Sequence, residues 1–200
     1  MRRAVRCGLL IVAATVSACS GTPSVVQPDP TFSPNPHRSE LVVKAGLDLC
    51  PASGAAAAPG GLPDVTLPCL GAGPAVHLAG LQGKPTVVNI WGSWCTPCQK
   101  ETTYLSTVYD SMKAKVRFLG VDDEDDPSSA LDFAPHVTPP MRYPSVVDDN
   151  KRVLIAMHTS AVPITIFVDA NGKVVHRNFG PYADVASLRA DIGRYLGVHG

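Results

Sequence analysis

The clearest candidates for chemistry in this sequence are two cysteines, Cys95 and Cys98, in the segment WGSWCTPCQKE at residues 91–101. A Cys-x-x-Cys pair can hold a metal, attach a haem, lock a turn or exchange electrons with other thiols. Haem attachment needs His where Gln99 stands, and a zinc ribbon needs a second pair that the sequence lacks. We therefore predict a redox-active pair with no metal and no cofactor. A purely structural disulfide is the alternative.

The elements around the pair indicate how it would react. The β-branched apolar run 84–92 is typical of a buried central strand, and an apolar face recurring along residues 96–115 predicts a helix. Cys95 would then open the helix, where free N–H groups and the helix dipole favour a thiolate and lower the thiol pKa. Cys98, on the side of Leu105, is expected to be buried. This asymmetry predicts Cys95 as the exposed nucleophile and Cys98 as the resolving thiol.

The chain from residue 64 onward alternates short apolar runs with amphipathic segments. The patterns predict a hairpin within 64–81, strands at 116–122, 144–149, 163–169 and 174–180, and helices at 126–136, 150–158 and 183–196. Asn171-Gly172 between the last two strands is a strong hairpin signal. This order predicts an α/β fold with a mixed central sheet and helices on both faces.

The first 18 residues read as an export signal. Three arginines precede an apolar run at about 8–16 that is too short to span a bilayer, and the run ends in VSAC. This ending resembles the lipobox of bacterial lipoproteins, in which the cysteine, here Cys19, receives a diacylglyceryl group and becomes the new N-terminus. An ordinary signal peptide or an uncleaved anchor is the alternative. We expect a lipid-anchored protein on the extracytoplasmic face of the cell membrane.

Residues 19–46 are rich in Ser, Pro and polar residues and are predicted to be a flexible tether, followed by a domain over 47–200. Cys50 and Cys69 flank a low-complexity stretch near the start of that domain. In an oxidising compartment they predict a structural disulfide, whose loop of about twenty residues would contribute roughly 3 kcal/mol. The alternatives are two free thiols, or a pairing that exchanges with Cys95 and Cys98.

A family resemblance covers about residues 64–197. The strand VVNIWGSW, the motif WCTPC and the segment VPITIFVDANGKVV together resemble the TlpA/ResA/DsbE group of membrane-anchored thioredoxin-like proteins. The resemblance implies a thioredoxin-like fold with an N-terminal β-hairpin and a helix–strand insertion at about 123–160. It implies that Pro163 is a cis-proline facing the cysteines, and that Val162 presents its backbone to a bound peptide. The residues expected to shape the site are Trp94, Thr96 and Pro97.

The sequence offers one candidate proton acceptor. Asn89 stands where thioredoxin has a buried Asp, as is usual in this group, and an amide cannot titrate. Glu101, three residues after Cys98, is the nearest acid that could take the proton of Cys98. The alternative is a surface glutamate. The acidic run 122–126 is interpreted as a solvated loop, with a recognition patch for a basic partner as the alternative.

These observations predict a thiol-disulfide oxidoreductase. The resemblance favours reduction of disulfides in exported proteins, apocytochrome c among them, with electrons from a membrane thiol/disulfide partner. Alternatives are a disulfide oxidase for exported proteins and a non-enzymatic binding module that uses the groove at Pro163. The formal net charge of zero and the lack of a basic stripe argue against nucleic acid as a partner.

Overall fold

The structure is a computed structural model that describes residues 36–200. The predicted signal peptide, the predicted lipidation site Cys19 and the tether up to residue 35 lie outside the described residues. Within residues 36–200, no helix combines the length and apolar character needed to cross a membrane.

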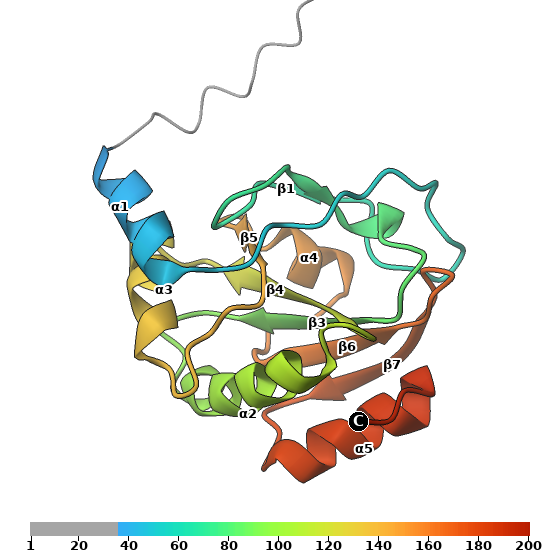
Figure 1. Ribbon diagram of the computed structural model, residues 1–200. Coiled ribbons are helices and arrows are strands. Elements are labelled where there is room, and N and C mark those ends of the chain that lie inside the picture. Colours follow the sequence, from blue (N-terminus) through green and yellow to red (C-terminus); the bar gives the residue numbers. More distant parts are fainter. Residues whose placement is uncertain (1–35) are drawn as a thin grey trace, which may run out of the picture. The chain divides into compact units, whose positions relative to one another are not determined.

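A mixed five-stranded sheet forms the centre of the domain (Figure 1). The middle strand, β3 (Thr86–Trp91), runs parallel to β4 (Arg117–Asp123) and antiparallel to β6 (Ile164–Val168). The outer strands are β5 (Ser145–Asp148), parallel to β4, and β7 (Val174–Phe179), antiparallel to β6. Every residue of β3 and β6 is buried, as expected for continuous apolar runs in central strands.

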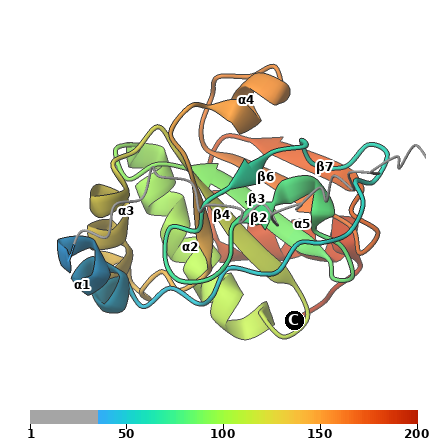
Figure 2. The same cartoon turned by 90° about the horizontal axis from the view of Figure 1, so that it is seen from above.

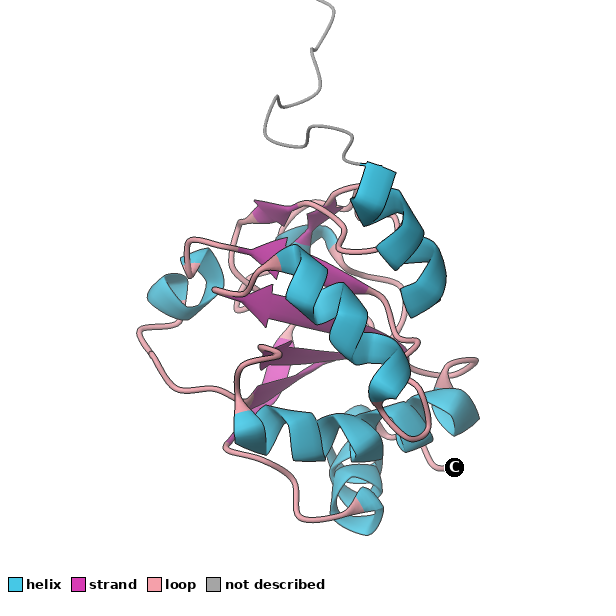
Figure 3. Ribbon diagram, turned by 90° about the vertical axis from the view of Figure 1, so that its left-hand side faces the viewer, coloured by secondary structure: helices cyan, strands magenta, loops and turns pink. Residues whose placement is uncertain are grey.

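The two faces of the sheet are covered differently. The apolar side chains of α2 (Thr96–Met112), α3 (Pro127–Phe133) and α5 (Val185–Leu196) join one core cluster, whereas α4 (Arg152–Ala156) and the hairpin of β1 (Thr66–Leu67) and β2 (Val76–His77) join another. In Figure 1, α2 and α5 lie below the sheet, and β1 and α4 lie above it. Two short 3₁₀ helices, η1 (Leu78–Gly80) and η2 (Ala134–His136), complete the fold. The predicted α/β architecture, a sheet with helices on both faces, is confirmed (Figure 3). The N-terminal hairpin and an insertion formed by α3, β5 and α4 are also present.

The N-terminal segment of the domain is attached to the outer strand β5. Cys50 and Cys69 form a disulfide across a sequence separation of 19 residues. Cys69 also forms a β-bridge with Val146 of β5, and the Leu70 N–H donates to the Ser145 carbonyl oxygen at 2.8 Å. The disulfide thus holds the low-complexity stretch against the sheet.

The predicted tether is wrong in its last part, because residues 36–45 form a helix, α1 (Pro36–Ala45). Leu41 and Ala45, one turn apart, are buried in the core cluster beside α3, and Lys44 forms an ion pair with Asp132 of α3 at 2.8 Å. Figure 2 shows α1 next to α3 at one side of the domain. The sequence did not predict this helix because two buried residues, Leu41 and Ala45, are too few to produce a periodic apolar pattern. Its stability comes from tertiary packing.

We predict that replacing both Cys50 and Cys69 with alanine lowers the free energy of unfolding by about 2–4 kcal/mol, because the unfolded chain regains loop entropy. Urea denaturation followed by circular dichroism measures this loss. Alkylation and mass spectrometry should show that Cys95 and Cys98 stay paired in the variant. A loss below about 1 kcal/mol would mean that the disulfide adds little to the packing of this segment.

Candidate redox site

Cys95 and Cys98 are joined by a disulfide at the start of α2. Cys95 is the N-cap residue of the helix, and its Sγ accepts the N–H of Cys98 at 3.3 Å. Pro97 lies in the first turn, where its missing N–H leaves no bond unmade. The local sequence therefore places Cys95 where backbone N–H groups and the helix dipole stabilise a thiolate.

The expectation that Cys95 is exposed is wrong in this disulfide form. Its relative exposure is 5%, against 1% for Cys98, so only a small part of Cys95 reaches the surface. The disulfide joins Cys95 to the buried Cys98. The exposed groups at the site are its neighbours, with Trp94 54% exposed and Thr96 and Pro97 also exposed.

The cis-proline lies at the same end of the sheet. The Val162–Pro163 peptide bond is cis, and the Pro163 carbonyl accepts the Gly180 N–H at 3.0 Å. Ile164 pairs with Ile90, which brings Pro163 opposite the end of β3, where the chain turns toward Cys95. Val162 packs against the core cluster that contains both cysteines. The structure thus brings Val162 and Pro163 to the redox end of the sheet.

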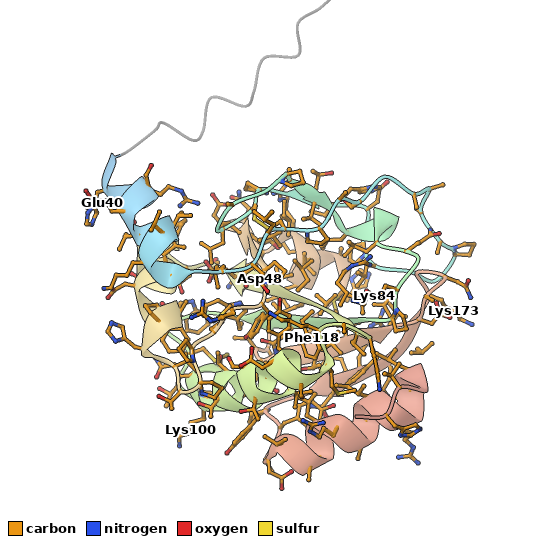
Figure 4. The ribbon with its side chains drawn as sticks, in the orientation of Figure 1. Glu40, Asp48, Lys84, Lys100, Phe118 and Lys173 are labelled. Atoms are coloured by element: carbon orange, nitrogen blue, oxygen red, sulfur yellow. A yellow bond between two sulfur atoms is a disulfide. The ribbon has the colours of Figure 1, made fainter. Side chains whose placement is uncertain are left out.

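A groove borders the exposed side of the first turns of α2. It has a volume of about 380 Å³, and its lining includes Thr96, Pro97, Lys100, Tyr104 and Tyr182. Figure 4 shows Lys100 at this end of the molecule and Lys84, just before β3, at the other. The groove therefore lies beside the first turn of α2, which carries Cys98.

Glu101 lies inside the protein, so the interpretation as a surface glutamate is wrong. Its relative exposure is 0%. One carboxylate oxygen accepts the Tyr182 N–H at 3.1 Å, and the other accepts the Asn89 Nδ2 amide at 3.2 Å. Burial raises the pKa of Glu101 to about 7, and these hydrogen bonds partly oppose the rise. A carboxyl group with this pKa can gain and lose a proton near neutral pH.

Asn89 has a positioning role that the sequence did not reveal. Its Nδ2 amide donates to Glu101 and to Thr165 Oγ1 of β6 at 3.3 Å. The residue that replaces the titratable Asp of thioredoxin thus holds another acid in place. Only the pairing of β3 with β6 and the packing of α2 bring these three side chains together.

The acidic run 122–126 is a solvated loop only in part, since Glu124 and Asp126 are exposed. Asp122 and Asp123 end β4 and are buried, and the Asp126 side chain caps α3 by accepting the Ser128 N–H at 2.7 Å. Asp125 accepts the Ser93 N–H, so the run contacts the turn that leads to Cys95. One signal was present in the sequence, since Asp122 falls within a segment predicted to be a buried strand.

Comparison with known proteins places this geometry in a family. The family model described as Redoxin matches residues 57–192, which is more than half of the chain. The chain belongs to the Redoxin family. The match includes both cysteines, Glu101 and Pro163.

Curated relatives of this Redoxin chain include two proteins named thiol-disulfide oxidoreductase ResA. The protein from Bacillus subtilis (strain 168) is 32% identical over 104 residues, which cover 52% of this chain and 57% of the relative. A protein from Bacillus cereus is 28% identical over 109 residues, covering 54% of this chain and 62% of the relative. The chain thus spans less than two thirds of the length of these relatives.

Solved structures share the fold. A putative thiol:disulfide interchange protein DsbE from Chlorobium tepidum is 24% identical with a TM-score of 0.59, and the match covers 74% of this chain and all of that one. A secreted Mycobacterium tuberculosis disulfide oxidoreductase is 24% identical with a TM-score of 0.57, covering 66% and 96%. These similarities confirm the thioredoxin-like fold.

We predict that Glu101→Gln removes a fall in stability that the wild type shows as pH rises, although the amide leaves one of the two donors at this site without an acceptor. The unfolded state releases this proton near pH 4.5 and the folded state near pH 7, so the stability of the wild type falls as pH rises between these values. Glutamine carries no charge and should avoid that fall, on the order of 2–3 kcal/mol at pH 8. Urea denaturation at pH 5 and pH 8 measures it. Glu40→Gln, at an exposed position on α1, serves as the control and should keep the wild-type fall in stability between these two pH values.

Proposed function

We propose that this protein is a thiol-disulfide oxidoreductase that acts through Cys95 and Cys98. The observation that carries the proposal is a disulfide that caps a helix N-terminus, with a buried carboxyl group of raised pKa one turn further along the same helix. The name shared by the curated relatives supports it.

The reaction transfers two electrons from the protein dithiol to a substrate disulfide. The Cys95 thiolate attacks one substrate sulfur, forms a mixed disulfide and releases the other substrate sulfur as a thiolate. The Cys98 thiolate then attacks Cys95 Sγ, which releases the second substrate thiolate and forms the Cys95–Cys98 disulfide. The substrate disulfide is reduced to two thiols, and the protein dithiol is oxidised.

The second step requires that Cys98 lose its proton inside the protein. Glu101 lies three residues further along α2, so the two side chains share a side of the helix. The Asn89 amide and the Tyr182 N–H hold the carboxylate in place as an acceptor. Glu101 accepts the Cys98 proton only when it is ionised, which ties this step to a pKa of about 7.

Substrate and location form the finer part of the proposal. The lipobox-like VSAC ending at Cys19 supports lipid anchoring on the extracytoplasmic face of the membrane. The groove beside Thr96 and Pro97, with a volume of about 380 Å³, supports binding of a peptide segment from an exported protein. We propose reduction of disulfides in exported proteins, apocytochrome c among them, with a membrane thiol/disulfide partner that restores the dithiol.

We predict that reduced wild-type protein reduces insulin disulfides, whereas Cys98→Ser stops at a covalent adduct between Cys95 and insulin. Without Cys98 the mixed disulfide has no internal thiol to resolve it. Non-reducing electrophoresis and mass spectrometry detect the adduct. The matched control, Cys95→Ser, should form none. Insulin reduction by Cys95→Ser at the wild-type rate would reject the proposal and favour a non-enzymatic role.

We predict that resolution of the mixed disulfide becomes faster as pH rises through about 7 in the wild type and loses this inflection in Glu101→Gln. The rate should also fall by about 10²-fold, since the amide cannot accept a proton. Stopped-flow fluorescence of Trp94 with a small peptide disulfide measures the step. Glu40→Gln should behave as the wild type. An unchanged inflection in Glu101→Gln would assign the proton to another group.

A further inference from the structure

A second buried carboxyl group lies near the redox site, on the strand that neighbours β3. Asp122 is 0% exposed, and its Cα is in register with that of Trp91, the last residue of β3. Neither of its carboxylate oxygens has a hydrogen-bond donor among the described residues. A buried carboxylate without a donor is costly, so this side chain needs a proton or a partner that carries one.

The Asp125 side chain, which acts on Asp122 through its charge, is the candidate partner. The two carboxyl groups lie within reach of a mutual hydrogen bond, and two carboxylates can form one only when they share a proton. Burial raises the pKa of Asp122 to about 9, and the charge of Asp125 adds to this rise. Asp125 is half-buried and reaches the surface, so the pair connects the interior to solvent.

The acidic run also holds the turn between β3 and α2. Asp125 Oδ2 accepts the Ser93 N–H at 2.5 Å, and the Asp123 carbonyl accepts the Trp94 indole N–H at 3.1 Å. Ser93 and Trp94 directly precede Cys95, so the run fixes the backbone on which the nucleophile is placed. The Gln99 side-chain amide, on α2, donates to the Ser93 carbonyl oxygen at 2.6 Å.

We propose that Asp122 and Asp125 form a proton-sharing carboxyl pair that positions the turn before Cys95 and sets the negative charge beside its thiolate. Both are positioning residues, because they act through Ser93 and through their charge. The inference rests on the proposed function and adds to it a second titratable group, separate from Glu101.

The charged groups around the pair come from few elements. Asp123, Asp125 and Asp126, in the same acidic run, act on Asp122 with negative charge. Arg38 of α1 acts with positive charge on Asp126, next to Asp125 in the chain. The strand neighbours of Asp122 are Trp91 on β3 and Val147 on β5, and both are neutral. At the N-terminus of α2, the charged group is the Cys95 thiolate of the reduced form.

The charge of the pair shifts the redox equilibrium of Cys95 and Cys98 in a defined direction. With Asp122 protonated, the pair carries the negative charge of one carboxylate. When Asp122 loses that proton at higher pH, the pair carries two, and the added charge destabilises the Cys95 thiolate. Ionisation of Asp122 therefore favours the disulfide form, whereas removal of the Asp125 charge favours the reduced form.

The test measures the equilibrium constant with glutathione for the wild type and three isosteric variants between pH 6 and pH 10. Ratios to the wild type at each pH cancel the titration of glutathione. At pH 7, Asp125→Asn should shift the constant toward the reduced form by about threefold or more. Asp126→Asn, in the same run, is the charge control and should shift it less. Asp122→Asn mimics the protonated acid, so it should match the wild type at pH 7 and depart toward the reduced form above pH 9.

Three results would overturn the proposal. One is an equal shift for Asp125→Asn and Asp126→Asn, which would indicate a general surface charge effect. Another is a shift at pH 7 in Asp122→Asn, which would show that Asp122 is already ionised there. The third is superposition of Asp122→Asn and the wild type up to pH 10. Failure of the proposed function is distinguishable, since the wild-type pair itself would then not exchange with glutathione.

Discussion

The junction between β3 and α2 is the constraint on which the site depends. Because a central strand ends at Trp91 and a helix begins at Thr96, Cys95 is held at a helix N-terminus with its sulfur beside the Cys98 N–H. The same helix then directs Cys98 and Glu101 into the core. The antiparallel strand β6 starts just after Pro163 and brings the cis peptide to the same end of the sheet. The electrostatics of one helix terminus and the register of one strand pair thus assemble the residues of the proposed reaction.

Around this junction the protein buries acids that a purely structural core would exclude. Glu101 and Asp122 both lie on the side of the sheet that α2 covers, and burial raises the pKa of each. Desolvation of a carboxylate is unfavourable, so such groups reduce the free energy of unfolding where they ionise. Carboxyl groups with pKa values moved toward the working pH are common where protons are transferred. The destabilisation is offset by the apolar strands on either side and by the Cys50–Cys69 disulfide at the outer strand.

Local patterns were sufficient to predict the framework. Apolar runs and the Asn171-Gly172 turn predicted the strands, and the placement of Cys95 at a helix start followed from the neighbouring patterns. Features that depend on contacts between distant segments were missed. Glu101 is buried because Tyr182, from the loop before α5, and Asn89 close over it. The helix α1 forms because Leu41 and Ala45 pack in the core cluster beside α3. The acidic run is held in place because Asp125 accepts the N–H of Ser93, in the turn before Cys95. No window of the sequence contains both partners of such a contact.

The most direct test of the account is a redox titration of the full chain with glutathione, read by alkylation and mass spectrometry of each cysteine. The account predicts one two-electron transition confined to Cys95 and Cys98, with Cys50 and Cys69 still paired, at a potential of about −250 mV or lower. A transition near about −120 mV would contradict the reductase and indicate an oxidant of exported proteins. A Cys95–Cys98 pair that opens only together with Cys50–Cys69 would contradict a redox-active site altogether.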